Sequence, residues 1–435
     1  MVICEECNQE GYGQCLPCHL KHQKNDFDKW TSGNEKIDKF IRNAQLNVDN
    51  RLKVIEWIPY NRFKDIKEIA KGGFGTIYCA KWIDGCIDKW DIENQQWKRS
   101  VQFEVVLKKF DNFGNLNEEF LNEMEIHLKT DFGRFIQIYG ITKDPETKKY
   151  IMVLQYMSDG NLRDYLKNQN IIWSHQIFQL YHLAADFERL HNLDIVHQDL
   201  HPGNILSNNF KKHLFHISDF GLSKIVGQNL ENSNKRNIFG VLPYIAPEVL
   251  CGEEYTKAAD VYSFGFIVYE LITGFTPYCD VPHDRDLARK ICNGLRPKIP
   301  FHIPKLFTGM VMRCWDARVA HRPTFSEFKN EAEKLFHNYN NKNSEIAIQI
   351  KKALKFSKNK SKSKFWRLIR RNSTITTPLN YQTHPEAIYT SRLLNYSNLP
   401  EPKNEENFEK ELEEITKSIS ALSVVASEPI NMHVP

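Results

Sequence analysis

The stretch that decides the fold reads Ile195-Val196-His197-Gln198-Asp199-Leu200-His201-Pro202-Gly203-Asn204-Ile205-Leu206, and Ser218-Asp219-Phe220-Gly221 follows it. It contains an aspartate, an asparagine five residues later and a second aspartate twenty residues after the first. This spacing is typical of phosphoryl transfer, in which Mg²⁺ ions neutralise the dense negative charge of the terminal phosphate. We predict that Asn204 and Asp219 bind the two Mg²⁺ ions. Asp199 is then the base that accepts the proton of the attacking hydroxyl.

A third motif supports this interpretation. An isolated Asp-Phe-Gly is common as an ordinary turn, so Asp219-Phe220-Gly221 carries little weight alone. Ala246-Pro247-Glu248 lies downstream of it. The combination of all three motifs favours catalysis over a turn.

Composition restricts the class of protein. With 435 residues, of which 41% are hydrophobic and 12% aromatic, the chain can build a large core. Its net charge of +4 is too small to indicate a nucleic-acid partner. No apolar run reaches the ~18 residues of a membrane span, and the first residues lack the pattern of a secretory signal. Six of the ten cysteines are scattered without a pairing pattern, which is typical of a reducing compartment: Cys79, Cys86, Cys251, Cys279, Cys292 and Cys314. We therefore expect an intracellular, cytoplasmic protein with no transmembrane segment.

Four regions follow one another along the chain. Residues 1–30 hold the other four cysteines, and residues 31–56 form a linker or a helix. Residues 57–336 alternate strand-like and helix-like patterns densely, as expected of the main domain. Residues 337–435 carry a basic block at 351–371 and an acidic block after it, so we expect a mostly disordered tail.

Residues 69–78 form a glycine-rich loop between two strand-like runs. The Gly-x-Gly-x-x-Gly pattern also opens dinucleotide-binding folds, but there it leads into a helix, whereas residues 76–80 have the β-branched and aromatic character of a strand. A loop between two strands is suited to ATP, because glycines let backbone N–H groups approach the phosphates. Ala70 replaces the first glycine of the pattern, which we expect to weaken nucleotide binding at most. The predicted nucleotide contacts of this loop are Ile69, Gly72, Gly73, Gly75 and Ile77.

A lysine and a glutamate are predicted to hold the nucleotide phosphates. Lys108 ends a strand-like run and would contact the α- and β-phosphates. The plain alternative is a solvated lysine at the end of a strand, a description that fits the neighbouring Lys109 equally well. Glu123 lies on the apolar side of an amphipathic helix, so it is favoured over Glu119 and Glu125 as the partner of Lys108.

The adenine contacts are expected in the next strand-like run. Residues 152–157 form this strand, which leads into a connecting segment. Gln155 and Met157 are the predicted contacts there, with Leu154 behind the adenine.

Together these motifs resemble those of the eukaryotic protein kinases, specifically the tyrosine-kinase-like group, over residues 63–336. Residues 57–63, 240–248 and 389–395 are more narrowly similar to a greatly expanded family of fungal kinases. The resemblance implies an α+β fold of two lobes, a small β-rich lobe and a larger helical one, with ATP bound between them. It also implies protein substrates.

The resemblance implies two further contacts. Asp260 would be buried and would support the catalytic loop, where the plain alternative is a helix N-cap. Glu248 would form an ion pair with Arg322, where the plain alternative is a surface arginine.

Three positions depart from the family pattern. Gln198 replaces the arginine that pairs with a phosphorylated activation segment in kinases of this type, so we expect a phosphate on Ser223 or Ser233 to order that segment weakly. His201 replaces the lysine typical of serine/threonine kinases, and Val241 replaces the threonine that partners it. Serine/threonine transfer remains the preferred interpretation, and tyrosine transfer stays open.

The first region offers four cysteines, as Cys4-x-x-Cys7 and Cys15-x-x-Cys18, which is the ligand set of a structural Zn²⁺ site. The spacer between the two pairs is shorter than in the usual zinc ribbon. Two alternatives stay open. The segment is metal-free, or residues 15–19 attach haem, which the missing export signal disfavours.

Residues 83–100 form an insertion between the second and third strands of the main domain. The sequence assigns it no function. Trp82, Trp90 and Trp97 are expected to pack against the sheet rather than to bind a ligand.

The tail contains two patterns. Basic and bulky apolar residues alternate at 365–371, a pattern that suits binding to an anionic membrane, binding to a helix-binding partner, or a solvated tail. Ser373, after two arginines, has the pattern of a basophilic phosphoacceptor site. A short seam of apolar residues at four- and three-residue spacing predicts a helix that docks onto a partner or onto the main domain: Phe408, Leu412, Ile415, Ile419 and Leu422.

The sequence therefore predicts an ATP-dependent protein kinase that phosphorylates protein hydroxyls in intracellular signalling. The alternative is a pseudokinase scaffold, which binds nucleotide and partners without transfer. A scaffold needs neither a metal pair nor a base, so the joint presence of all five motif residues argues against it: Lys108, Glu123, Asp199, Asn204 and Asp219. A zinc-dependent nucleic-acid module would rest on the first region alone, and the mild net charge disfavours it.

Overall fold

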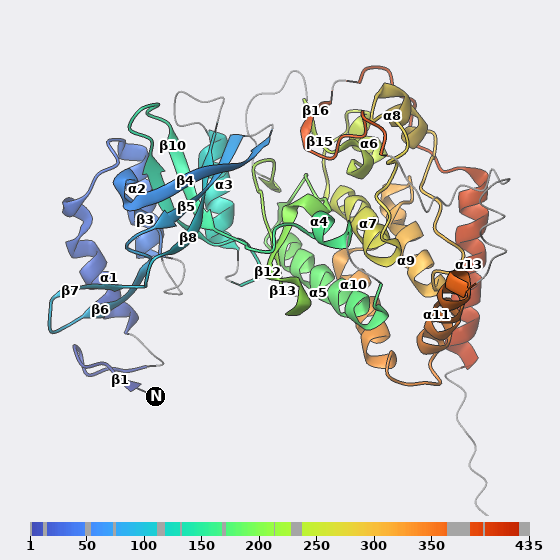
Figure 1. Cartoon of the computed structure of the whole chain (residues 1–435), viewed down its shortest axis with the longest axis horizontal. Helices are drawn as coiled ribbons and strands as arrows, with labels where there is room; N and C mark the ends of the chain where they lie inside the picture. The colour runs from blue at the N-terminus through green and yellow to red at the C-terminus, as the bar shows by residue number, and fades with distance from the viewer. Residues whose placement is uncertain are drawn as a thin grey trace, which may run out of the picture. The chain divides into compact units, whose positions relative to one another are not determined.

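The computed structural model describes residues 2–11, 15–47, 54–72, 75–110, 118–130, 133–167, 171–212, 214–227, 237–362, 383–394 and 396–425. The chain divides into two compact units. Figure 1 shows the chain coloured by residue number, from blue at the N-terminus to red at the C-terminus. Unit 1 comprises Met1–Ser158 and His216–Gly221. Unit 2 comprises Asp159–Phe215 and Leu222–Pro435.

Unit 1 is built on a six-stranded sheet in the order β3-β9-β10-β8-β5-β4. The first pair, β3 with β9, is parallel, and the other neighbours are antiparallel. The strands are β3 (Glu56–Trp57), β4 (Phe63–Gly72), β5 (Gly75–Trp82), β8 (Phe103–Lys109), β9 (Ile138–Lys143) and β10 (Tyr150–Gln155), and the helix α3 (Glu118–Lys129) follows β8 in the chain.

The core of this sheet forms around Trp82, whose side chain is fully buried. Phe63, Phe103 and Tyr139 surround its ring, with centroids 5.8 to 6.5 Å away. Aromatic rings at these separations bury large apolar surfaces and favour tilted or edge-on contacts. The prediction that Trp82 packs into the sheet is confirmed.

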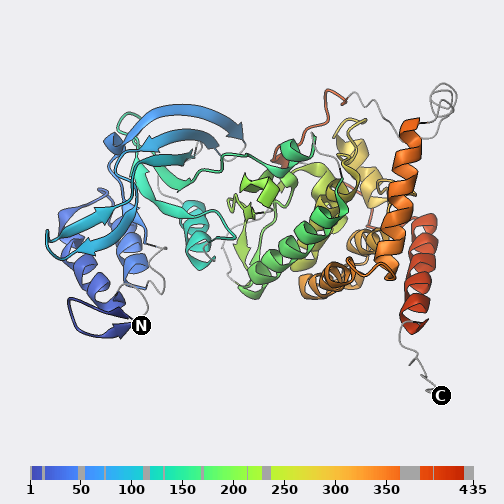
Figure 2. The same cartoon turned by 60° about the horizontal axis from the view of Figure 1, so that its bottom comes forward.

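Trp90 and Trp97 depart from the same prediction. They lie on a separate hairpin of β6 (Ile87–Asp91) and β7 (Gln96–Arg99), which belongs to the insertion and not to the six-stranded sheet. Their rings contact the N-terminal helix α1 (Leu16–Asn25), which lies beside the hairpin in Figure 1 and Figure 2. His22 stacks on Trp90 with centroids 3.8 Å apart, and Trp97 Nε1 donates to Asp26 at 2.7 Å. The insertion therefore holds the N-terminal segment.

The remaining elements ahead of the main domain are short. β1 (Val2–Ile3) pairs with β2 (Glu10–Gly11), and α2 (Glu35–Leu46) follows α1. Asn34 caps α2, because its side chain accepts hydrogen bonds from the N–H groups of Lys36 and Ile37. Of the two forms predicted for residues 31–56, the helix is present.

Unit 2 is mainly helical. Its early elements are α4 (Leu162–Lys167), α5 (Trp173–Asn192), β11 (Ile195–Val196), β12 (Ile205–Asn209), β14 (Lys224–Ile225) and β15 (Ile238–Gly240). The strand β13 (Leu214–Ile217) begins in this unit, and its last two residues belong to the stretch assigned to unit 1. The later helices are α6 (Pro247–Leu250), α7 (Lys257–Thr273), α8 (Arg285–Cys292), α9 (Lys305–Cys314) and α10 (Phe325–Asn338). The sheet unit followed by a helical unit agrees with the predicted α+β class.

Aromatic packing joins the long helices of unit 2. Phe187 on α5, Phe264 on α7 and Phe325 on α10 are all fully buried, and their ring centroids lie 5.1 to 5.5 Å apart. Gly265 lets α7 approach α9 closely, because a Cβ there would lie 2.7 Å from the Cβ of Cys314. This packing fixes the middle of α7 against α5, α9 and α10.

Three segments of the tail have regular structure. They are α11 (Glu345–Lys362), β16 (Arg392–Leu394) and α13 (Glu406–Val425). α13 packs on α9 with Phe408 and Ile415 buried, so the predicted helix docks onto the main domain. These segments are more ordered than their charge blocks predicted, because the few apolar residues among the charges find cover on unit 2. The alternating basic segment at 365–371, Ser373, and the side chains of Ile419 and Leu422 lie outside the described residues.

None of the described helices combines the length and the hydropathy that crossing a bilayer would require.

Candidate active site

The predicted phosphate lysine lies in the middle of the unit 1 sheet. Lys108 is opposite Ile77 on β5 and Met152 on β10, so strands on both sides fix its backbone. Its side chain is buried, with a relative exposure of 5%. A lysine held this way needs an anionic partner, because an unpaired buried ammonium is strongly unfavourable.

Two carboxylates supply that partner. Nζ of Lys108 lies 2.5 Å from Oε1 of Glu123 on α3 and 2.8 Å from Oδ1 of Asp219. Burial alone would lower the pKa of Lys108, but the charges of Asp219 and Glu123 outweigh it, and the pKa is raised. Lys108 therefore keeps its charge, and unit 1 brings together three of the residues predicted from the sequence.

The structure also separates the predicted pair from the similar residues beside it. Lys109 points elsewhere and pairs with Asp144 at 2.6 Å. Glu125 pairs with Lys129 one turn along α3, at 2.8 Å. The pairing of Lys108 with Glu123 is confirmed.

The Asp-Phe-Gly segment is anchored by its phenylalanine. Phe220 is fully buried, and its ring lies 5.0 Å from the ring of His127, edge to face. His127 lies one helical turn after Glu123, and its Nδ1 lies 3.0 Å from the carbonyl of Ile136. Sequence reasoning missed His127, although its i,i+4 spacing from Glu123 on the apolar side of α3 was a usable signal. Asp219 has a φ of 62°, a left-handed conformation that is uncommon outside glycine and concentrates at functional sites.

The glycine loop connects β4 to β5, and a strand follows it as predicted. Gly72 pairs with Gly75, and Ala70 pairs with Ile77. Gly75 has a φ of 148°, and a Cβ there would lie 2.2 Å from the carbonyl oxygen of Lys109, so the position requires glycine. Ile69 is half exposed on β4, while Gly73 lies outside the described residues.

The predicted adenine contacts lie at the end of β10. The N–H of Gln155 donates to the carbonyl of Gln137 at 2.9 Å, which fixes the last residue of the strand. Leu154 and Met157 are buried. All three belong to unit 1, together with Lys108.

The predicted base lies in unit 2, in the loop after β11. Asp199 is buried, and its carbonyl accepts a hydrogen bond from Nδ2 of Asn204 at 2.9 Å. The same Nδ2 lies 3.4 Å from Oδ2 of Asp199. The amide of Asn204 is therefore oriented by the residue five positions before it.

Asp260 holds this loop through main-chain contacts. Its side chain is fully buried, Oδ2 accepts the N–H of His197 at 2.8 Å, and Oδ1 accepts the N–H of Gln198 at 3.0 Å. Gln198 has a φ of 68°, so the carboxylate stabilises a strained turn directly before the predicted base. Thr256 caps α7, which rules out the N-cap alternative for Asp260.

A second buried contact supports the same region. Arg322 donates to both oxygens of Glu248, at 2.6 and 2.7 Å. Both side chains are almost completely buried. This two-pronged geometry is the strong form of a charge-assisted hydrogen bond, and the predicted pair is confirmed.

The positions that depart from the family pattern also have defined surroundings. Nδ1 of His201 accepts the N–H of Gly203 at 3.0 Å, and Nε2 faces Oδ1 of Asp199 at 3.7 Å. Val241 is buried. Ser223 is 1% exposed and donates to the carbonyl of His197, so it is poorly placed to accept a phosphate. Ser233 lies outside the described residues.

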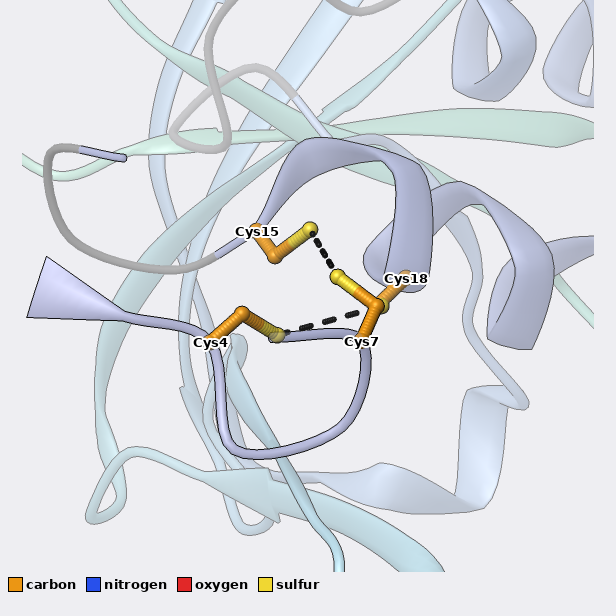
Figure 3. Close-up of side chains that lie close together, drawn as sticks. All are labelled: Cys4, Cys7, Cys15 and Cys18. Carbon is orange, nitrogen blue, oxygen red and sulfur yellow. Dashed lines mark hydrogen bonds between the residues drawn. The ribbon is translucent and has the colours of Figure 1, made fainter. Parts of the chain in front are cut away.

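The four N-terminal cysteines converge. Cys4 and Cys7 come from the turn after β1, and Cys15 and Cys18 come from the start of α1 (Figure 3). The sulfurs of Cys7 and Cys15 are 3.4 Å apart, those of Cys4 and Cys18 are 3.9 Å apart, and all four lie within 4.8 Å of one another. This cluster could hold a metal ion.

Comparison with known proteins agrees with the geometry. Residues 63–332 match the family described as protein tyrosine and serine/threonine kinase. The chain is 28% identical to the putative serine/threonine-protein kinase/receptor R831 of Acanthamoeba polyphaga mimivirus, over 71% of this chain and 17% of that protein. It is 26% identical to the tyrosine-protein kinase SPK-1 of Girardia tigrina, over 62% of this chain and 52% of that protein. It is 25% identical to the dual specificity protein kinase pyk3 of Dictyostelium discoideum, over 64% and 19%.

The chain thus spans about half or less of the length of these relatives. The match nevertheless covers more than half of the chain, including every motif residue from the glycine loop to Arg322. The narrower assignment to a tyrosine-kinase-like or fungal group stays a prediction. The chain belongs to the protein tyrosine and serine/threonine kinase family.

Proposed function

We propose that this chain is an active protein kinase that transfers the γ-phosphate of ATP to hydroxyl groups of proteins. The observation that carries the proposal is the buried ammonium of Lys108, bonded to both Glu123 and Asp219. A scaffold without catalysis has no need of this arrangement, which costs desolvation of three charges. The pseudokinase alternative has no comparable observation in its favour.

The residues divide the chemistry as follows. Asp199 would orient the attacking hydroxyl and accept its proton, and Asp260 would hold Asp199 by fixing the backbone before it. Lys108 would contact the α- and β-phosphates, with its ammonium oriented by Glu123. These proposed roles are the same as those predicted from the sequence.

The family uses ATP and Mg²⁺, and the donor set fits the metal. Mg²⁺ prefers oxygen ligands, which the carboxylate of Asp219 and the amide of Asn204 can supply. The side chain of Asp219 is 35% exposed even while it contacts Lys108, so a cation can reach it. When bound, Mg²⁺ would neutralise charge on the phosphates.

We favour serine and threonine as acceptors. Support comes from relatives whose names describe serine/threonine kinases, while others are named tyrosine or dual specificity kinases. Nε2 of His201 faces Oδ1 of Asp199 at 3.7 Å, where serine/threonine kinases of the family carry a lysine, so a side-chain nitrogen still lies beside the predicted base. Intracellular signalling, in the cytoplasm, is the expected setting of this activity.

A radiolabel experiment tests the proposal. The purified full chain is incubated with γ-labelled ATP, Mg²⁺ and casein, and the labelled casein is hydrolysed to identify the phosphoamino acid. We expect phosphoserine and phosphothreonine, with no label from a Lys108→Met chain. Nucleotide binding without label transfer, by the wild type and by variants with an altered tail, would favour the pseudokinase.

For the N-terminal cluster we propose a structural Zn²⁺ site. A tetrahedral ZnS₄ site with Zn–S distances of about 2.3 Å separates its sulfurs by ~3.8 Å, close to the spacing of Cys4, Cys7, Cys15 and Cys18. Four thiolates leave no open coordination position, so the metal would stabilise the fold of the segment and take no part in catalysis.

Elemental analysis tests the zinc proposal. Protein prepared without chelator should release about one zinc per chain on denaturation, and Cys15→Ser should abolish it. Phosphotransfer should survive, with Cys86→Ser as the control for loss of an unrelated thiol. Zinc-free protein with an intact α1 would contradict the proposal.

The docking surface that we propose for α13 is the main domain itself. Phe408 and Ile415, two residues of its predicted apolar seam, are already buried within unit 2. Protein substrates, which the kinase family implies, are the partners that we propose for this chain.

A further inference from the structure

We propose that the tail segment 383–394 is an intramolecular substrate of this kinase and that Ser391 is its phosphoacceptor. The inference rests on the proposed function. Its central observation is that Oγ of Ser391 donates a hydrogen bond to Oδ2 of Asp199, the predicted catalytic base. The two residues are 192 positions apart in the chain, so the contact is not a local accident of sequence.

This contact is the one that the chemistry requires. A general base must lie within hydrogen-bond reach of the proton it removes, and the acceptor hydroxyl must be the donor. Thr390, the neighbouring hydroxyl residue, is exposed to solvent instead. The strand therefore selects one of two adjacent hydroxyls.

The backbone of the tail segment is held as a strand on β15, which lies in the activation segment, residues 219–248. β16 pairs antiparallel with β15, with Arg392 opposite Gly240, Leu393 opposite Phe239 and Leu394 opposite Ile238. In Figure 1 these two strands lie together within unit 2. Strand addition is a common mode of peptide recognition, in which main-chain hydrogen bonds give affinity and alternate side chains give specificity.

A buried polar network holds the residues just before Ser391. Nη1 of Arg163 donates to the carbonyl of Tyr389 at 2.9 Å, and Nη2 donates to the hydroxyl of Tyr244 at 3.0 Å. Burial raises the pKa of Tyr244, so its hydroxyl stays protonated and donates in turn to Glu270. The hydroxyl of Tyr389 donates to the carbonyl of Pro277 at 2.6 Å.

Contacts on both sides of Ser391 extend the docking. Nδ1 of His283 lies 2.9 Å from the carbonyl oxygen of Ile388, and the backbone N–H of His283 donates to the carbonyl of Glu386 at 3.0 Å. On the other side, Leu394 is 2% exposed. A segment fixed at so many points is positioned, not merely collapsed onto the surface.

The transfer itself balances simply. The Ser391 hydroxyl loses its proton to the Asp199 carboxylate, its oxygen forms a bond to the γ-phosphorus of ATP, and the bond from that phosphorus to the β,γ-bridging oxygen breaks. The products are phosphoserine, ADP and one proton. A phosphoserine beside the Asp199 carboxylate repels it, so the modified segment should leave and expose the site to other proteins.

The experiment follows phosphate on the full chain. Wild-type protein is incubated with ATP and Mg²⁺ and analysed by tandem mass spectrometry over time. We expect phosphate on Ser391 at a first-order rate that does not change with protein concentration, because an intramolecular reaction depends only on the docked geometry. A Lys108→Met chain mixed with wild type should remain unmodified at Ser391.

Three variants sharpen the result. Ser391→Ala should lose the modification, while the matched Thr390→Ala should behave like wild type. Leu394→Asp should release the segment and slow Ser391 phosphorylation by roughly a hundredfold. This variant should phosphorylate casein without a lag, whereas wild type should show a lag until its docked segment is phosphorylated and leaves.

The outcomes separate the two proposals. Casein phosphorylation with Ser391 unmodified would overturn the intramolecular substrate and leave the kinase assignment intact. Modification that accelerates with protein concentration, or that appears on the Lys108→Met chain, would also overturn it. Failure of both wild type and Leu394→Asp to phosphorylate casein or Ser391 would overturn the kinase assignment itself.

Discussion

The two halves of the predicted machinery are held by different forces. In unit 1, Lys108 is positioned by side-chain charges from two other segments, Glu123 on α3 and Asp219. In unit 2, Asp199 is positioned mainly by its backbone, because Asp260 accepts main-chain N–H groups of the two residues before it. The first arrangement depends on ion pairs, and the second depends on the shape of a loop.

This difference predicts different consequences of mutation. Removing one member of a buried ion pair leaves its partners unpaired, which destabilises the fold as well as the site. Weakening a main-chain clamp leaves the charges intact but lets a strained loop relax. The predictions below test whether stability and catalysis separate in this way.

The largest effect on catalysis is expected for Asp199→Asn. The amide cannot accept the proton of the acceptor hydroxyl, so kcat should fall by roughly 10²–10⁴-fold. ATP affinity should stay within a few-fold, since Asp199 belongs to the acceptor side of the reaction. Peptide phosphorylation rates and calorimetric ATP titration measure the two quantities. Unchanged turnover would remove Asp199 from the role of base.

The largest effect on stability is expected for Lys108→Met. Glu123 and Asp219 would be left as neighbouring carboxylates without a cation, which costs on the order of 3–5 kcal/mol for a buried pair. Denaturant unfolding measures this loss. Lys109→Met is the matched control, because its pair with Asp144 is less deeply buried, at 15% and 10% exposure. Equal losses for the two variants would contradict the distinct role of Lys108.

An intermediate effect is expected for Asp260→Asn. Its amide offers one acceptor oxygen to the two N–H groups of His197 and Gln198, so one buried donor loses its partner, at a cost of about 1–3 kcal/mol. The loop should shift Asp199, and kcat should therefore fall more than ATP affinity. Asp286→Asn on α8 is the control, because its pairs with Arg289 and Lys290 are exposed. A loss of ATP affinity equal to the loss of kcat would show that Asp260 does not act through the loop.

The smallest effect is expected for Ser233→Ala. Gln198 supplies no positive charge for a phosphate on the activation segment, so Ser233 phosphorylation should add little order. Initial rates on casein should be the same for the variant and for wild type, both before and after treatment with phosphatase. Mass spectrometry reports whether wild-type Ser233 carries phosphate in each sample. A large fall in rate, restored by rephosphorylation of Ser233, would show that another cation replaces the missing arginine.

Much of the fold was predictable from local pattern. The strand after the glycine loop followed from the β-branched and aromatic residues at 76–80, and the helix that carries Glu123 followed from its apolar spacing. The fate of Trp90 and Trp97 was not predictable, because an aromatic side chain signals burial without naming the surface that buries it. Their partner, α1, lies some seventy residues away and is contacted through His22 and Asp26.

The sequence by itself determined which residues we predict to carry the chemistry, because the predicted base, metal ligands and lysine occur in the motifs and at the spacings typical of protein kinases. Only the tertiary structure decided which distant residues these side chains contact. Lys108 meets Asp219 across 111 positions, and Ser391 meets Asp199 across 192. Residues so distant are brought together by packing of whole elements, which local pattern does not encode. The placement of Ser391 on the predicted base is therefore a property of the folded chain alone.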